Sequence, residues 1–315
     1  FGNGYNSASG KAVLFVVDLA DGSLIKKFDV GGTDNGLAAP SLYDADGNGT
    51  TDYIYAGDLQ GRMWKFDVTA STESGWEVAF SGDPLFTAVG PSGNPQPITA
   101  APELGAPPAG VGGVMVYFGT GRFFVNGDMT DHTVQSLYGL LDDGTAIHGT
   151  DRSLLQAQQI LTEGPDTSGR TVRTVSKNPV SYASQRGWYL DLLPLSGTKQ
   201  GERVVSTPRR QFQRVFYTTM IPSDDPCRFG GDSWVMELQP DTGGMTEASI
   251  FDLSPGADLL AGLKTTVGII KSFEFLYQGG KGVMVDLGST GLTESTAISP
   301  PVVATGRVSW REIID

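Results

Sequence analysis

The residues with the clearest chemical potential lie in one short segment, DADGNGTTD, from Asp44 to Asp52. With Asp44 as position 1, oxygen-bearing side chains fall at positions 1, 3, 5 and 9, as Asp44, Asp46, Asn48 and Asp52. Calcium takes about six to eight oxygen ligands, and alternating side chains can wrap around it, with the backbone carbonyl at position 7, Thr50, as a further ligand. Gly49 at position 6 permits the sharp turn. The spacing predicts a Ca²⁺ site.

The segment begins like an EF-hand loop but does not end like one. Position 12 is Tyr55, where an EF-hand has a bidentate Glu, and Tyr53–Ala56 reads as a strand instead of an exiting helix. The prediction is therefore a short EF-hand-like loop closed early by Asp52. The alternative is an acidic turn without metal, since Asp and Asn are common in turns. Repulsion among three carboxylates within nine residues favours a bound cation.

Strands are expected to position this loop. The chain has 315 residues and 43 glycines without a collagen period, which indicates many tight turns between short strands. The predicted strands are Ala12–Asp18, Tyr53–Ala56, Met63–Asp67, Gly113–Gly119, Gln135–Leu141, Gly187–Asp191, Arg214–Met220, Ser233–Leu238 and Gly282–Leu287. Helical periodicity favours only two short helices, Ser153–Leu161 and Pro255–Leu263.

A recurring hairpin pattern suggests the architecture. A strand ending in Asp, a Gly-containing turn and a returning strand occur at 13–28, 53–68 and 235–251. Repeated antiparallel hairpins predict a β-propeller of about seven blades over a single domain, 1–315, at roughly 40–45 residues per blade. Two tandem β-sandwiches are the alternative, but no linker supports them. The Pro/Gly-rich stretch 91–113 is interpreted as a long surface loop between blades, and Thr162–Ser176 as a second irregular stretch that forms another insertion.

The segment PSLYDADGNGTTDYIYAGDLQGRMWKFDV (40–68) resembles the C-terminal domain of the PilC/PilY family of type IV pilus-associated proteins, whose D-x-D-x-N-x-x-x-D loop runs into a Y-A-G-D-x-x-G-x-x-W-x-F-D segment. Family-like motifs occur in order along the chain. They are FGNGYNSASGKAVLFVVD (1–18), YFGTGRF (117–123), QSLYGLLD (135–142), GWYLDL (187–192), GERVVSTP (201–208), DPCRFGGDSWVMEL (225–238) and GRVSWRE (306–312).

The resemblance implies an all-β, modified seven-bladed β-propeller forming a C-terminal fragment of a longer extracytoplasmic protein. It implies a role in pilus biogenesis and adhesion at the bacterial cell surface, associated with the outer membrane, with pilins or other pilus components and host surface ligands as partners. Calcium at Asp44, Asp46, Asn48, Thr50 and Asp52 would then control pilus extension against retraction, and hence twitching motility. The chain has no Arg-Gly-Asp motif, so that mode of host adhesion is not expected.

Other functions find less support. A net charge of −13 disfavours nucleic-acid binding, and no apolar run approaches the roughly 20 residues that span a bilayer. His132 and His148 have no triad or metal spacing, so we expect no enzyme. Cys227, the single cysteine, is interpreted as an ordinary loop residue or buried thiol, and a reactive thiol or a disulfide to an absent segment stay open as alternatives. The alternative function is a propeller lectin or quinone-type enzyme braced by calcium. We interpret the strand tryptophans as inter-blade packing residues, namely Trp64, Trp188, Trp234 and Trp310.

Overall fold

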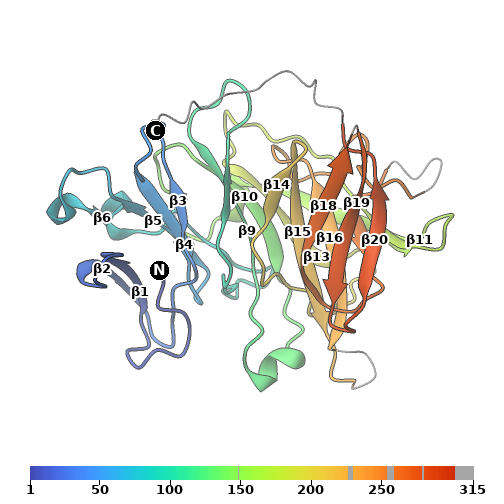
Figure 1. Cartoon of the computed structure of the whole chain (residues 1–315), viewed down its shortest axis with the longest axis horizontal. Coiled ribbons are helices and arrows are strands. Elements are labelled where there is room, and N and C mark those ends of the chain that lie inside the picture. Colours follow the sequence, from blue (N-terminus) through green and yellow to red (C-terminus); the bar gives the residue numbers. More distant parts are fainter. Residues whose placement is uncertain (148, 226–229, 254–258, 279, 302–315) are drawn as a thin grey trace.

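The computed structural model describes residues 1–301 except 148, 226–229, 254–258 and 279 (Figure 1). Within these residues the regular structure is β-strand interrupted by short 3₁₀ turns, which confirms the all-β prediction. The turns are η1 (Glu73–Gly75), η2 (Phe80–Gly82), η3 (Asn126–Met129) and η4 (Arg152–Leu154).

The described strands form four sheets. The first sheet pairs β1 (Ala12–Val17) with β2 (Leu24–Gly31). The second contains, in spatial order, β3 (Ser41–Tyr43), β4 (Tyr53–Gly57), β5 (Arg62–Asp67) and β6 (Glu77–Val78), and β7 (Phe86–Thr87) also pairs with β5. The third contains, in spatial order, β14 (Arg209–Gln211), β15 (Arg214–Pro222), β16 (Gly231–Leu238), β17 (Gly262–Lys264), β12 (Thr171–Val175), β11 (Gln156–Pro165), β13 (Gly187–Pro194), β10 (Ser136–Asp142), β9 (Val114–Gly119) and β8 (Glu103–Gly105). The fourth is β18 (Ile270–Gln278), β19 (Lys281–Gly288) and β20 (Thr293–Ile298).

These sheets divide into five blade-like units that follow one another in the order of the sequence, from β1–β2 to β18–β20 (Figure 1). The ten-stranded sheet holds two four-stranded antiparallel units, β8–β9–β10–β13 and β14–β15–β16–β17. A separate buried cluster lies at each junction between successive units, built for example around Phe66, Tyr138, Trp188 and Phe273. Face-to-face packing of small antiparallel sheets is the packing of a propeller.

One hairpin changes the propeller plan. The strands β11 and β12 join the two four-stranded units, because β11 pairs in parallel with β13 while β12 pairs with β17. The hairpin covers sheet edges that would otherwise expose unpaired backbone groups. The described residues thus contain five units, two of them joined, and the prediction of seven blades is not confirmed.

The structure corrects three local predictions. Ser153–Leu161 is not a helix: η4 is followed by β11, in which Gln158 and Ile160 are buried with the period of two typical of a strand. Thr162–Ser176 is not irregular, since it holds the end of β11 and all of β12, and this hairpin is inserted between β10 and β13, which pair with each other. The third predicted hairpin, 235–251, is also wrong, because β16 pairs with β15 and β17 and Phe251 instead bridges Ile298 on β20.

Most other local predictions are confirmed. The nine predicted strands and the hairpins at 13–28 and 53–68 are present, and the stretch 91–113 is irregular apart from β8. Of the predicted helix Pro255–Leu263, residues 255–258 lie outside the described residues, and its end enters β17.

The described strand tryptophans pack between units, as predicted. Trp188 is fully buried and its Nε1 donates to the carbonyl of Pro240 at 2.8 Å. A Cβ on Gly139 or Gly243 would overlap its ring, so both positions require glycine. Trp64 and Trp234 are also buried, and Trp310 lies outside the described residues.

Candidate metal centre

The predicted loop is the connection of a β-hairpin. Residues 44–52 join β3 to β4, and Tyr43 pairs with Tyr53 at the base. The Asp52 N–H donates to the carbonyl of Tyr43 at 2.9 Å, and the Asp52 carbonyl accepts from the Val68 N–H at 2.9 Å. The ladder therefore fixes both ends of the loop.

Within the loop, Asp44 organises the backbone. Its Oδ1 accepts from the N–H of Gly47 at 2.7 Å and of Asn48 at 3.2 Å, and its Oδ2 accepts from the Gly49 N–H at 2.7 Å. Gly47 and Gly49 have φ of 76° and 88°, which glycine adopts without the strain of a side chain. The backbone N–H groups, that of Gly49 first, hold the pKa of Asp44 below its usual value, because they stabilise the ionised carboxylate.

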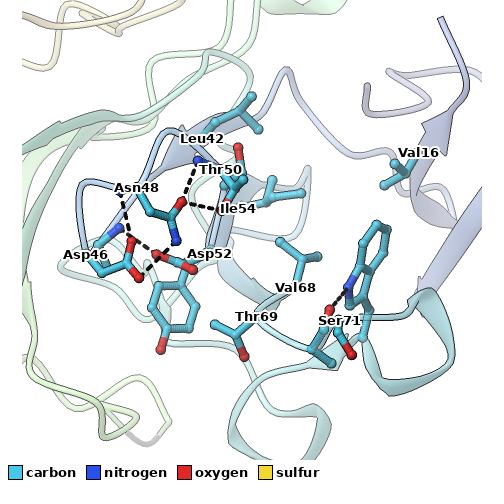
Figure 2. Close-up of a pocket in the computed structure, with 15 residues that line it drawn as sticks. Val16, Leu42, Asp46, Asn48, Thr50, Asp52, Ile54, Val68, Thr69 and Ser71 are labelled. Atoms are coloured by element: carbon cyan, nitrogen blue, oxygen red, sulfur yellow. Dashed lines mark hydrogen bonds between the residues drawn. The ribbon is translucent and has the colours of Figure 1, made fainter.

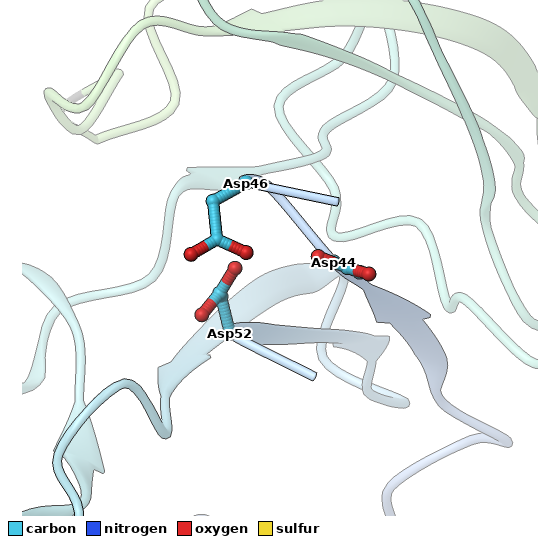
Figure 3. A group of neighbouring side chains, drawn as sticks. All are labelled: Asp44, Asp46 and Asp52. Carbon is cyan, nitrogen blue, oxygen red and sulfur yellow. The ribbon is translucent and has the colours of Figure 1, made fainter. Parts of the chain in front are cut away.

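The loop brings three carboxylates together (Figure 3). One ligand oxygen from each of Asp44, Asp46 and Asp52 lies within 4.8 Å of the other two. Calcium–oxygen distances of about 2.3–2.6 Å place two ligands of one ion no more than roughly 4.6–5.2 Å apart. The carboxylates therefore fit a calcium ion. They are the only such group of three His, Cys, Asp or Glu side chains in the described part of the chain.

Of the other two predicted ligands, Asn48 makes its side-chain hydrogen bonds within the loop, and Thr50 donates its N–H to Asn48. Asn48 donates from Nδ2 to Asp46 Oδ2 at 2.9 Å, and its Oδ1 accepts from the Thr50 N–H at 2.7 Å. Asp52 Oδ2 accepts from the Ala45 N–H at 2.8 Å. A half-turn of the Asn48 amide would exchange its oxygen and nitrogen. The structure thus groups three of the five predicted ligands directly and places Asn48 beside Asp46 (Figure 2).

Tyr55, the residue at EF-hand position 12, has a structural role instead. It is fully buried, and its hydroxyl donates to Asp142 Oδ2 at 2.6 Å on β10. Burial, reinforced by the Asp142 charge, raises the pKa of Tyr55. Lys65 Nζ lies 2.8 Å from the same Asp142 oxygen and 4.0 Å from the ring centroid of Tyr53. The strand leaving the loop is therefore anchored to the next blade-like unit.

A cavity of about 850 Å³ lies beside the loop (Figure 2). Asp46, Asn48 and Asp52 line one part of it, and Ile54, Val68 and Trp76 line another. Sequence reasoning missed Trp76, which follows a polar segment after β5; an aromatic residue within STESGWEV was the available signal.

The remaining predicted candidates add no second centre. His132 is exposed and lies in no cluster of metal-ligating side chains. His148 and Cys227 lie outside the described residues. No helix in the described ranges is long and apolar enough to cross a bilayer.

Fold and site together define an all-β, propeller-type protein that carries an acidic hairpin loop. The chain belongs to the PilY1 family, because the family model of the PilY1 beta-propeller domain matches residues 1–170.

Curated relatives and a solved structure agree with this membership. The chain is 39% identical over 262 residues to a type IV pilus biogenesis factor PilY1 homolog of Xylella fastidiosa, covering 78% of this chain and 18% of the relative. It is 38% identical over 289 residues to the type IV pilus biogenesis factor PilY1 of Pseudomonas aeruginosa, covering 80% and 25%. The crystal structure of the Pseudomonas aeruginosa PilY1 C-terminal domain matches with a TM-score of 0.81 and 31% identity, over 95% of this chain and 68% of that one. The chain thus spans a quarter or less of these two curated relatives.

Proposed function

We propose that this chain is the calcium-binding propeller domain of a type IV pilus biogenesis and adhesion factor. Calcium occupancy of the loop 44–52 regulates pilus extension against retraction, and so twitching motility. The observation that carries the calcium proposal is the convergence of Asp44, Asp46 and Asp52 within 4.8 Å. The names of the relatives support the pilus role.

Each loop residue has a distinct part in this proposal. Asp44, Asp46 and Asp52 supply carboxylate oxygens, Asn48 an amide oxygen after its half-turn, and Thr50 its backbone carbonyl. These hard oxygen donors suit calcium, whereas magnesium demands a tighter octahedron and retains more of its waters. Bound calcium would offset the mutual repulsion of the carboxylates and draw Asn48 into the site.

The proposed partners are pilins or other pilus components and host surface ligands. The proposed location is the pilus and the outer-membrane surface. The role is non-enzymatic, which the description of the relatives as biogenesis factors supports.

The test combines calorimetry with motility. Asp52→Ala removes one of the three carboxylates, and we expect calcium affinity to fall by about 100-fold or more, beyond the roughly 10–100-fold typical of outer-shell changes. Asp83→Ala is the matched control, because Asp83 is exposed and lies outside the loop. Unchanged affinity in Asp52→Ala would refute the site assignment.

The proposed regulation of pilus extension by calcium is tested with the full-length protein in piliated cells. Cells carrying Asp44→Ala or Asp52→Ala should lose the calcium dependence of twitching, while cells carrying Asp83→Ala should keep it. Twitching that follows calcium equally in all three variants would overturn the regulatory proposal even if the loop binds the ion.

A further inference from the structure

The cavity beside the loop, called the loop groove below, combines two kinds of surface. Its apolar wall includes Leu42, Ile54, Val68 and Trp76, and its charged lining residues are Asp46 and Asp52. Its volume of about 850 Å³ lies within the range of roughly 300–1,000 Å³ found for ligand pockets. The groove therefore has the size and the mixed chemistry of a recognition site.

The apolar wall is exposed because the two-stranded β1–β2 sheet covers only part of the wider sheet that contains β3, β4 and β5. Leu42, Ile54 and Phe66 are in register across β3, β4 and β5, so their side chains form one row on one face. The β1–β2 sheet packs over the inner part of this row, where Phe66 and Ile54 are buried. Leu42 lies at the outer end of the row and is 64% exposed. The row is thus left open to solvent on the loop side.

The charges around the groove select the kind of partner. Both charged lining side chains are carboxylates, and the chain as a whole carries a net charge of −13. Trp76 Nε1 donates to the carbonyl of Ala70 at 2.9 Å, which holds the indole in place. A fixed indole offers both apolar contact and a π-face for a cation. Charge complementarity therefore favours a basic partner with apolar side chains.

We propose that the loop groove binds an extended peptide segment of a protein partner in which lysine or arginine alternates with apolar residues. Its apolar side chains contact Leu42 and Trp76, and its basic side chains contact Asp46 and Asp52. Calcium and the peptide compete, because the three loop carboxylates carry a formal charge of −3 that a bound calcium ion reduces to −1. The competition rests on the proposed calcium site, whereas peptide binding does not.

The residues allow the two activities to be separated. Asp44 belongs to the carboxylate cluster but does not line the groove, while Asp46 and Asp52 belong to both. Leu42 lines the groove without belonging to the cluster, and its exposure makes Leu42→Ser compatible with folding. Asp44→Asn therefore weakens the calcium site without changing a side chain that lines the groove, and Leu42→Ser changes the groove without changing a carboxylate of the cluster.

The experiment is calorimetric titration of the chain with a capped peptide of alternating lysine and leucine, in EGTA and in excess calcium. We expect binding in EGTA and about tenfold weaker binding in calcium, equivalent to about 1.4 kcal/mol. Leu42→Ser should weaken peptide binding and keep calcium binding. Asp44→Asn should bind the peptide equally with and without calcium.

Distinct results would overturn the proposal. The proposal fails if the chain does not bind the lysine–leucine peptide in EGTA, or if it binds the matching glutamate–leucine peptide equally well. It also fails if Leu42→Ser leaves the peptide affinity unchanged, or if the peptide binds more strongly in calcium than in EGTA. A chain that binds the peptide but no calcium would refute the proposed calcium function and the competition, and leave the groove standing. A chain that binds calcium but not the peptide would refute the groove alone.

Discussion

The pKa values of carboxyl groups are shifted in opposite directions in the acidic loop and in the C-terminal half of the molecule. In the loop, the pKa of Asp44 is lowered by backbone N–H donors, that of Gly49 first, and the side chain is exposed. On β19, burial raises the pKa of Asp286 to about 7, with Glu294 adding to the shift and Arg170 opposing it. Burial likewise raises the pKa of Glu237 on β16 to about 7, against donors that include Ser249. Backbone donors favour the ionised form of Asp44, whereas burial favours the protonated forms of Asp286 and Glu237.

This difference shows what the loop is suited for. Where desolvation outweighs the nearby donors, as at Asp286 and Glu237, an interior carboxyl reduces the cost of burying a charge by holding its proton to higher pH. The loop carboxylates are instead solvated and held by N–H groups, so their charges stay concentrated at one point of the surface. Such a concentration of negative charge attracts a cation.

The largest effect is expected where a buried carboxylate is ionised and paired. Asp142 is buried and has Lys65 as its cation at 2.8 Å. Lys65→Met should lower the free energy of unfolding by about 3–5 kcal/mol, because it leaves a buried charge unpaired. Urea denaturation measures this loss, and Lys65→Met/Asp142→Asn should recover much of it. A loss below about 1 kcal/mol would show that the pair behaves like a surface ion pair.

The second-largest expected effect is a dependence of the free energy of unfolding on pH, which arises from Asp286. Between its usual value of 3.8 and about 7, the unfolded chain loses this proton while the folded chain keeps it. The folded state binds more protons in this window, so the free energy of unfolding falls as pH rises, by about 1.4 kcal/mol per pH unit at most. Above about pH 7 the folded chain has also lost this proton, and the free energy of unfolding falls no further on account of Asp286.

Asp286→Asn should reduce that slope, leaving the contribution of Glu237, and should stabilise the chain at pH 8 by about 2–3 kcal/mol relative to wild type. Denaturation curves at several pH values measure it. Asp83→Asn is the control, since Asp83 is exposed. An equal slope in wild type and Asp286→Asn would assign the pH dependence to other groups.

The third effect concerns the loop itself. Calcium at about one hundred times its Kd should raise the free energy of unfolding by about 2.7 kcal/mol, because the ion binds only the folded loop. Thermal denaturation with and without EGTA shows this as a shift in Tm. Asp52→Asn should abolish the shift and Asp83→Asn should retain it. Stabilisation that persists in Asp52→Asn would place the ion elsewhere.

The smallest effect is expected from Gly49→Ala. The φ of 88° disfavours an L side chain, although space around the Cβ is open, so the loop should be destabilised by about 1–2 kcal/mol. Calorimetry should show weaker calcium binding with all three carboxylates present. Gly22→Ala, at φ 75° in the β1–β2 turn, is the control for strain away from the loop.

Local sequence was sufficient where local chemistry determines the structure. The loop was found from the spacing of Asp44, Asp46 and Asp52, and the structure brings these three side chains together. The hairpin β4–β5 was predicted from apolar strands around a Gly-containing turn, and it forms. Family membership was inferred from ordered motifs and is confirmed.

Prediction failed where distant segments determine the structure. Ser153–Leu161 contains good helix formers, but Ile160 is buried between β12 and β13, and this packing overrides local preference. Trp76 and Leu42 line one groove only because β1–β2 covers part of the neighbouring sheet. The orientation of the Asn48 amide depends on its hydrogen bonds to Asp46 and Thr50, which spacing alone does not reveal.

The β11–β12 hairpin also constrains how the chain is made. During synthesis β12 emerges well before β17, the strand with which it pairs. Until residues 262–264 leave the ribosome, the outer edge of β12 has no partner and can pair with other nascent chains. The central sheet can close only after most of the described chain has been translated, so this edge must be protected from other chains during translation.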